Sequence, residues 1–116
     1  MISESVTRKI GDVDVVDISG RLNLSDALAS IETSILDLID KGSRRLVIHV
    51  PALTSIDSAG IGMLMACSGQ MAQKHGKLRI AGAQGGVARQ FEVVHLDRVA
   101  ALDADLETAC RALEEG

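Results

Sequence analysis

Residues 46–65 read LVIHVPALTSIDSAGIGMLM, and they place a strand, a loop and a helix one after another. Leu46 to Val50 is almost entirely apolar, which is typical of a short strand that is covered on both faces. We expect a loop over Pro51 to Asp57, and then a helix from about Ser58 to His75 that stops at Gly76. Strands that alternate with helices in this way favour an α/β protein whose helices pack on a sheet.

The chain before this stretch predicts a hairpin and one helix. Ser5 to Ile10 and Val13 to Ile18 are short β-branched runs that flank Gly11-Asp12, a turn of the type that closes hairpins. Gly20 ends the second run, and the helix that follows reaches about Lys41. That helix is defined by two candidate N-caps (Asn23 and Ser25), an apolar face (Leu28, Ile31, Ile35, Leu38 and Ile39) and a C-terminal glycine (Gly42).

The alternation continues after the central helix. Leu78 to Ala81 predicts another strand, and a glycine-rich loop and two further helices follow it. The expected fold is therefore α/β, with a mixed sheet of about four to five strands packed against about four helices, in one domain over residues 1–116. Gly82, Gly85 and Gly86 predict the loop, and Val87, Phe91 and Val94 predict the third helix. The fourth helix is predicted from Asp103 as its cap and from the apolar residues Leu106, Ala109, Cys110 and Leu113.

Composition excludes several classes of function. The 116 residues include one Phe and no Tyr or Trp, and their formal net charge is −4 with a pI near 5.2. These values argue against direct nucleic-acid binding through a basic face or a base-stacking platform. No apolar run is long enough for a membrane span, and the start does not resemble a signal peptide. Cys67 and Cys110 make no metal spacing, so we expect no metal, and we expect no cofactor either. Two cysteines also do not form a disulfide framework, so we expect a protein of the reducing cytoplasm.

Ser58 is the candidate functional residue. It should lie in the first turn of its helix, where unpaired backbone N–H groups and the positive end of the helix dipole favour a phosphate. Gly60 and Gly62 each cost about 1 kcal/mol relative to Ala inside a helix. Either they leave a bare backbone for another protein to approach, or they allow tight packing against a neighbouring loop. Equally, Ser58 could be only a helix cap, a role that Asp57 could share.

The inner face of this helix is predicted to comprise Ile61, Leu64, Met65, Ser68 and Met71, and Met63 is a possible partner contact if it is exposed.

Two enzymatic interpretations are weaker. A hydrolase nucleophile in a Gly-x-Ser-x-Gly elbow would need glycine where Ile56 stands, and no histidine is an evident base. We expect His49 in a strand with a local hydrogen bond, His75 at a helix C-terminus and His95 on a surface turn. The glycines of residues 82–86 fit neither dinucleotide nor P-loop spacing, so nucleotide binding there has little support. We therefore expect a protein that works by binding and not by catalysis.

Four stretches together resemble the STAS domain family, and specifically the bacterial anti-sigma factor antagonists. The first is Asp57-Ser58-Ala59-Gly60-Ile61-Gly62 at the start of the central helix, and the second is Gly20-Arg21-Leu22-Asn23 after the second strand. The others are the buried strand 46–50 and the segment from Leu78 through Val87 and Phe91 to Leu96-Asp97-Arg98. The resemblance covers nearly the whole chain. The chain departs from many relatives at two positions, since Asn23 stands where they have Asp and His49 where they have Asp or Asn.

The resemblance implies a phosphorylation switch at Ser58. Its kinase would be the partner, an ATP-dependent anti-sigma factor serine kinase, and a PP2C-type phosphatase would reverse the reaction. The unphosphorylated form would bind the anti-sigma factor and so free a sigma factor, as a monomer or weak homodimer. The implied partner-binding residues are Asp57, Ala59, Gly60 and Ile61, together with Gly20, Leu22, Asn23 and Leu24 of the turn after the second strand.

Two alternatives stay open within the same family. One is a scaffold-type STAS protein of a large signalling complex, in which the serine tunes assembly. The other is a STAS accessory subunit of a lipid or anion transporter.

Overall fold

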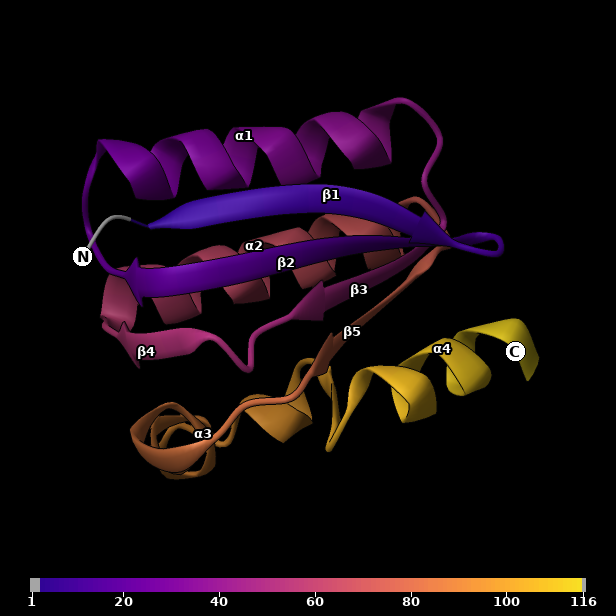
Figure 1. Cartoon of the computed structure of the whole chain (residues 1–116). Helices are drawn as coiled ribbons and strands as arrows, with labels where there is room; N and C mark the ends of the chain where they lie inside the picture. The colour runs from indigo at the N-terminus through magenta and orange to yellow at the C-terminus, as the bar shows by residue number, and fades with distance from the viewer. Residues whose placement is uncertain (1–2, 116) are drawn as a thin grey trace.

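The computed structural model describes residues 3–115, which form one mixed sheet with helices on both faces (Figure 1). The predicted fold class is confirmed, although the sheet has six strands in these residues and not four to five. The strands are β1 (Glu4–Ile10), β2 (Val13–Leu22), β3 (Arg45–His49), β4 (Leu53–Ile56), β5 (Lys77–Ala81) and β6 (Ala101–Asp103). The helices are α1 (Asp26–Asp40), α2 (Ser58–Gln73), α3 (Gly85–Val93), the short 3₁₀ helix η1 (Leu96–Arg98) and α4 (Leu106–Glu115).

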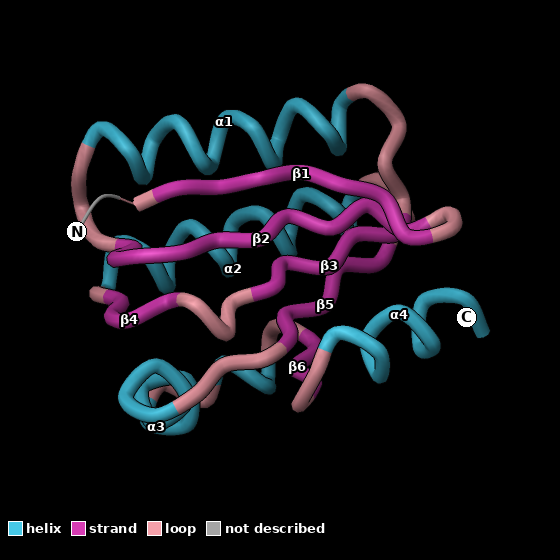
Figure 2. The backbone as a smooth tube through the Cα atoms, viewed as in Figure 1, coloured by secondary structure: helices cyan, strands magenta, loops and turns pink. Residues whose placement is uncertain are grey.

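The sheet has the order β1-β2-β3-β5-β6, and β4 pairs with the far end of β2 (Figure 2). Among the described strands only the β1–β2 hairpin is antiparallel, and its register runs from Glu4 opposite Ser19 to Ile10 opposite Val13. All other pairs are parallel. β2 is long enough to pair with β3 along its first half and with β4 along its second half. The register of the β2–β4 pair shifts between Gly20 and Arg21, so the pairing there is irregular.

Successive side chains of the strands lie on opposite faces of the sheet and form a hydrophobic layer on each face. In β2, Val16 and Ile18 pack beneath α1, α2 and α3, whereas Val13 and Val15 pack beneath α4. Leu46 and its neighbours in β3 are buried on both faces, as their apolar run predicted. α1 and α2 lie on one face of the sheet and α4 lies on the other (Figure 1).

Helix α1 begins and ends where the sequence predicts. Ser25 is its N-cap, and the Ser25 hydroxyl accepts a hydrogen bond of 3.2 Å from the Leu28 amide. Gly42 follows the C-cap with φ of +111°, a left-handed conformation that glycine adopts without strain. α2 begins at Ser58 as predicted but ends at Gln73, and His75 takes the left-handed conformation there (φ 62°).

Two short strands were not predicted. Residues 53–56, expected as part of a loop, form β4 as the parallel partner of β2. Ala101–Asp103 forms β6 beside β5, so the expectation that Asp103 caps the last helix is wrong. That helix begins later, and Asp105 accepts a 2.8 Å hydrogen bond from the Thr108 amide in the capping geometry. Asp103 instead pairs with Arg79 of the neighbouring strand.

The buried face of α2 is also rotated relative to the predicted one. Met65 is 42% exposed and Ser68 is only half-buried, whereas Met63 and Cys67 are buried. The reason is that α2 carries no charged residue from Ser58 to Gln73, so no polar stripe marks its outer side. Val94, predicted as a residue of the third helix, follows the end of α3 as its C-cap and is exposed.

Candidate functional site

Ser58 is the first residue of α2, and it is exposed. It follows β4, which ends at Ile56, and Asp57 is the N-cap between strand and helix. α1 and α2 both begin at this end of the sheet (Figure 1), so the positive ends of two helix dipoles lie close together. The predicted position of Ser58 in the first turn of a helix is confirmed.

Asp57 connects the starts of these two helices. One carboxylate oxygen, Oδ1, accepts a 2.9 Å hydrogen bond from the Gly60 amide of α2. The other, Oδ2, accepts a 3.0 Å hydrogen bond from the Leu24 amide, in the loop before α1. These two amides hold the pKa of the Asp57 carboxyl below its ordinary value because they stabilise its charged form. Asp57 is therefore an ionised clamp between the β2–α1 loop and α2.

The two glycines of the first turn have different surroundings. A Cβ atom at Gly60 would lie 2.3 Å from the Leu22 carbonyl oxygen and 2.7 Å from the side chain of Ile56. The same Leu22 oxygen accepts a 3.2 Å hydrogen bond from the Asp57 amide, which fixes it in place. Gly60 is thus explained by tight packing against the end of β2. Nothing lies within 4 Å of a Cβ at Gly62, which is exposed, so a partner can reach the backbone there.

The structure divides the predicted partner-binding residues into exposed and supporting groups. Leu24 is 80% exposed, while Asp57, Asn23 and Ala59 are half-buried. The remaining four are buried, and the side chains of Leu22 and Ile61 therefore support the site from inside: Gly20, Leu22, Gly60 and Ile61. Their role in partner binding stays a prediction. Met63, a possible contact if exposed, is also buried at 4% exposure.

Sequence reasoning missed the chemistry of the outer side of α2. We define the α2 outer face as the exposed residues Gly62, Met65, Ala66 and Gly69, which continue along the helix from Ser58. None is charged, and three of the four are glycine or alanine. The signal was present in the sequence as a 16-residue helix, SAGIGMLMACSGQMAQ, that has no Asp, Glu, Lys or Arg. An exposed helix face without charges is unusual unless something covers it.

The histidines lie away from Ser58. His49 points to the α4 side of the sheet, where its Nδ1 lies 2.7 Å from the Asp17 carboxylate, itself paired with Arg8. His75 follows the opposite end of α2, and His95 precedes η1. The predicted positions of all three are confirmed. Among residues 3–115, no group of three His, Cys, Asp or Glu side chains is arranged to hold a metal ion.

Comparisons with known proteins agree with the fold. A family model described as "Mlab, STAS domain" matches residues 5–108. An anti-sigma factor antagonist from Mycobacterium paratuberculosis superposes with a TM-score of 0.84 at 23% identity, over 97% of this chain and 95% of that one. The phosphorylated form of the Bacillus cell fate determinant SpoIIAA gives 0.69 at 19% identity, over 94% and 98%. A sulfate transporter family protein from Wolinella succinogenes gives 0.71 at 16% identity, over 90% and 89%. Within residues 3–115, none of the helices has both the length and the apolar composition that a membrane span requires.

Proposed function

The chain belongs to the STAS domain family, and on that premise we propose that it is an anti-sigma factor antagonist controlled by phosphorylation of Ser58. The unphosphorylated form binds an anti-sigma factor serine kinase, and phosphate transfer from ATP to the Ser58 hydroxyl ends that binding. A PP2C-type phosphatase restores the first form. The chain works by binding and not by catalysis, and it acts in the cytoplasm, where ATP is available to such a kinase.

The observation that carries this proposal is the exposed Ser58 hydroxyl at the junction of two surfaces. On one side lies Leu24, held by its amide to Asp57. On the other side the α2 outer face begins. A kinase that docks on both surfaces has the hydroxyl group between its contacts. Two of the structural neighbours support this interpretation, because one is named an anti-sigma factor antagonist and another is named in a phosphorylated form.

The α2 outer face suits a reversible protein contact. It presents glycine and alanine, which let a partner backbone approach closely, and Met65, whose flexible side chain adapts to different surfaces. Because the face has no charge, a partner can cover it without the free-energy cost of removing water from charged side chains of α2. The clamp at Asp57 keeps the neighbouring loop in one position before binding, which reduces the ordering entropy lost in the complex.

Phosphorylation changes the charge of this junction more than its shape. A phosphate adds about −1.5 to −2 charge next to Asp57, which is already ionised. The helix dipole of α2 stabilises the phosphate in the free protein. In a complex with an uncharged docking face, however, the phosphate must lose its water, and this costs several kcal/mol. Since each 1.4 kcal/mol is about tenfold in affinity, a loss of roughly 3–4 kcal/mol would empty most of the complex.

The test uses variants of Ser58 as baits for affinity capture from the native cell. We expect Ser58→Ala to capture an ATPase kinase and Ser58→Glu to lose it. Ser30→Glu, at an exposed serine in the second turn of α1, is the matched control and should capture the kinase as wild type does. Incubation of the captured kinase with wild-type protein and ATP should then place one phosphate on Ser58, measured by mass spectrometry. Equal capture by the Ala and Glu baits would refute the proposal.

The likeness to the sulfate transporter family protein favours one second candidate, an accessory subunit of a transporter. In that case the partner would be a membrane protein or its cytoplasmic ATPase, and capture would not depend on ATP. The same affinity experiment separates the two candidates if detergent-solubilised membranes are included. Co-purification of a transporter with both Ser58 variants would favour the second candidate.

A further inference from the structure

A cavity of about 490 Å³ lies at the other edge of the molecule from the β1–β2 hairpin, between the ends of β5 and β6 and helices α3 and η1. Ile80 of β5, Phe91 of α3 and Leu102 of β6 line its inner wall. Ile80 and Phe91 are buried core residues, and Leu102 is half-buried and packs on them. The volume is in the range of small-molecule sites, which lie typically outside the carboxyl ends of parallel strands.

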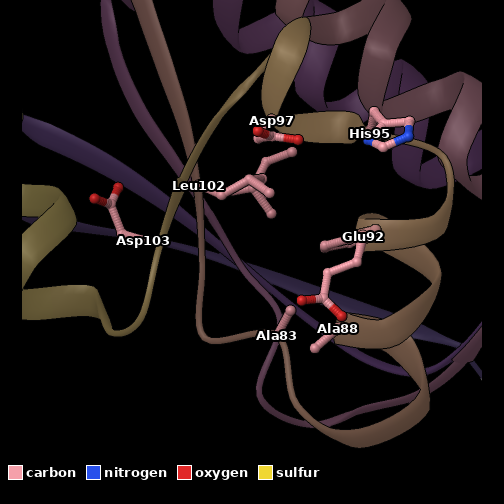
Figure 3. A pocket seen from close by; sticks show the side chains of 9 residues that line it. Ala83, Ala88, Glu92, His95, Asp97, Leu102 and Asp103 are labelled. Carbon is pink, nitrogen blue, oxygen red and sulfur yellow. The ribbon is translucent and has the colours of Figure 1, made fainter.

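The polar groups at the mouth of this cavity are acidic. Glu92 comes from α3 and Asp97 from η1. Figure 3 shows the Asp97 carboxylate above Leu102 and the Glu92 carboxylate on the other side of the cavity, beside Ala88. Both are exposed, and neither forms an ion pair with a residue in the described range 3–115. Asp103 also belongs to the lining, but its carboxylate is bound by Arg79 at 2.6 and 3.1 Å and lies beyond the β6 ribbon in Figure 3.

His95 completes the mouth of the cavity. It has the left-handed backbone conformation (φ 54°) at the turn between α3 and η1, a conformation that costs energy in a residue other than glycine. Its amide donates a 3.1 Å hydrogen bond to the Glu92 carbonyl, which closes the turn, and its ring lies on the Asp97 side of the mouth (Figure 3). A neutral imidazole offers one nitrogen as a hydrogen-bond acceptor.

We propose that this cavity binds a small protonated amine with a compact apolar body. The body fills the space against Phe91 and Leu102, and the ammonium group binds at the acidic mouth, where the charges of Glu92 and Asp97 attract it. The mouth has two carboxylates and no lysine or arginine side chain among its lining residues, so it disfavours phosphates and carboxylic acids. This inference is independent of the proposed switch, because the cavity includes neither Ser58 nor the α2 outer face.

The test compares three probes of nearly equal shape and different charge. Phenethylamine is the cation, phenylacetate the anion and 2-phenylethanol the neutral form. Each is titrated into ¹⁵N-labelled full-length protein, and amide shifts are followed by NMR. We expect saturable shifts from phenethylamine at residues 80–103, with a dissociation constant at least tenfold below that of phenylacetate. No saturable shift, equal affinity for the two ions, or shifts centred elsewhere would overturn the proposal.

Two variants and one control locate the site. The double variant Glu92→Gln with Asp97→Asn keeps the shape of the mouth and removes its charge, so phenethylamine affinity should fall about tenfold while 2-phenylethanol binding stays unchanged. Ala88→Leu fills the cavity from α3 and should weaken all probes that bind there. Glu107→Gln, on the exposed side of α4, is the charge control and should have no effect. An unchanged midpoint of thermal unfolding shows that each variant is folded. Undiminished phenethylamine binding by the double variant would refute the inferred role of the carboxylates.

Discussion

Helices α1 and α2 lie side by side on one face of the sheet, start at the same end and bury similar faces, but their outer surfaces differ (Figure 1). α1 exposes Asp26, Asp37 and Asp40 to water, and Asp37 pairs with Lys41 after the helix. α2 exposes only uncharged residues over 16 positions. Both helices bury an apolar face in the same core, so core packing does not explain why only α1 has charged residues on its exposed face. The charged side chains of α1 favour contact with water, whereas the uncharged α2 outer face can be buried against another protein.

The largest expected effect separates packing from docking within α2 itself. Gly60→Ala places a methyl group 2.3 Å from the Leu22 carbonyl oxygen, which is backbone and cannot rotate away. We expect the free energy of unfolding to fall by on the order of 3 kcal/mol, as for overpacked sites. Urea unfolding followed by circular dichroism measures this. A loss below about 0.5 kcal/mol would mean that the end of β2 is free to move away from α2.

The second prediction tests the α2 outer face with a charge. Met65→Glu introduces a carboxylate where the side chain is 42% exposed, so the free energy of unfolding should change by no more than about 0.5 kcal/mol. Binding to the proposed kinase partner should weaken at least about tenfold, or 1.4 kcal/mol, because the charge must be desolvated. Isothermal titration calorimetry measures the affinity.

The matched control for Met65 is Thr33→Glu, an exposed position in the neighbouring helix α1. It adds the same charge to the same face of the molecule but outside the proposed contact, so the affinity should stay within about twofold. Equal weakening by both variants would indicate a general electrostatic effect, and the contrast between the two helices would lose its functional meaning.

The fold was predictable wherever local chemistry decided the structure. The hairpin turn, the Ser25 cap and the buried strand β3 were each encoded by neighbouring residues. β4 was missed because its four residues include exposed Thr54 and Ser55, and its identity as a strand depends on pairing with the distant end of β2. β6 has only three residues and depends on β5 in the same way.

The site was predictable in its chemistry but not in its packing. A serine after an N-capping aspartate places the hydroxyl at the helix start whatever the tertiary fold. The role of Gly60, in contrast, is set by the Leu22 carbonyl, which only the folded chain brings near. The orientation of α2 could not be obtained from its periodicity, because both of its sides are uncharged. Contacts between distant residues therefore decided which predicted residues reach the surface.

The third prediction compares two capping aspartates. Asp57→Ala and Asp105→Ala both remove a carboxylate that accepts backbone hydrogen bonds, at α2 and α4 respectively. Both variants should unfold at lower urea than wild type at neutral pH. Only Asp57→Ala should weaken kinase binding, because only Asp57 also holds the Leu24 amide. Asp57→Asn should restore much of the capping, since asparagine is also a good N-cap.

The pH dependence of these two caps has a definite sign. The pKa of each carboxyl is lower in the folded protein than its ordinary value, so the unfolded state binds protons more readily. The stability that each carboxylate adds is complete above the unfolded pKa, about 4, and is lost as the pH falls through the folded pKa. The difference between wild type and either alanine variant should therefore shrink below pH 4. A difference that stayed constant down to pH 2 would contradict the role of the ionised caps.

The smallest expected effect comes from Gly62→Ala, the same substitution as Gly60→Ala two residues further along α2. The added methyl group meets nothing within 4 Å, and alanine is the better helix former, so stability should rise by about 0.5–1 kcal/mol in urea unfolding. Kinase affinity should fall by about tenfold, since the methyl group occupies space that the bare backbone leaves to the partner. A variant that is both more stable and a weaker binder would indicate that this glycine is retained for docking. A more stable variant with full affinity would place the contact elsewhere and leave the uncharged face of α2 without that explanation.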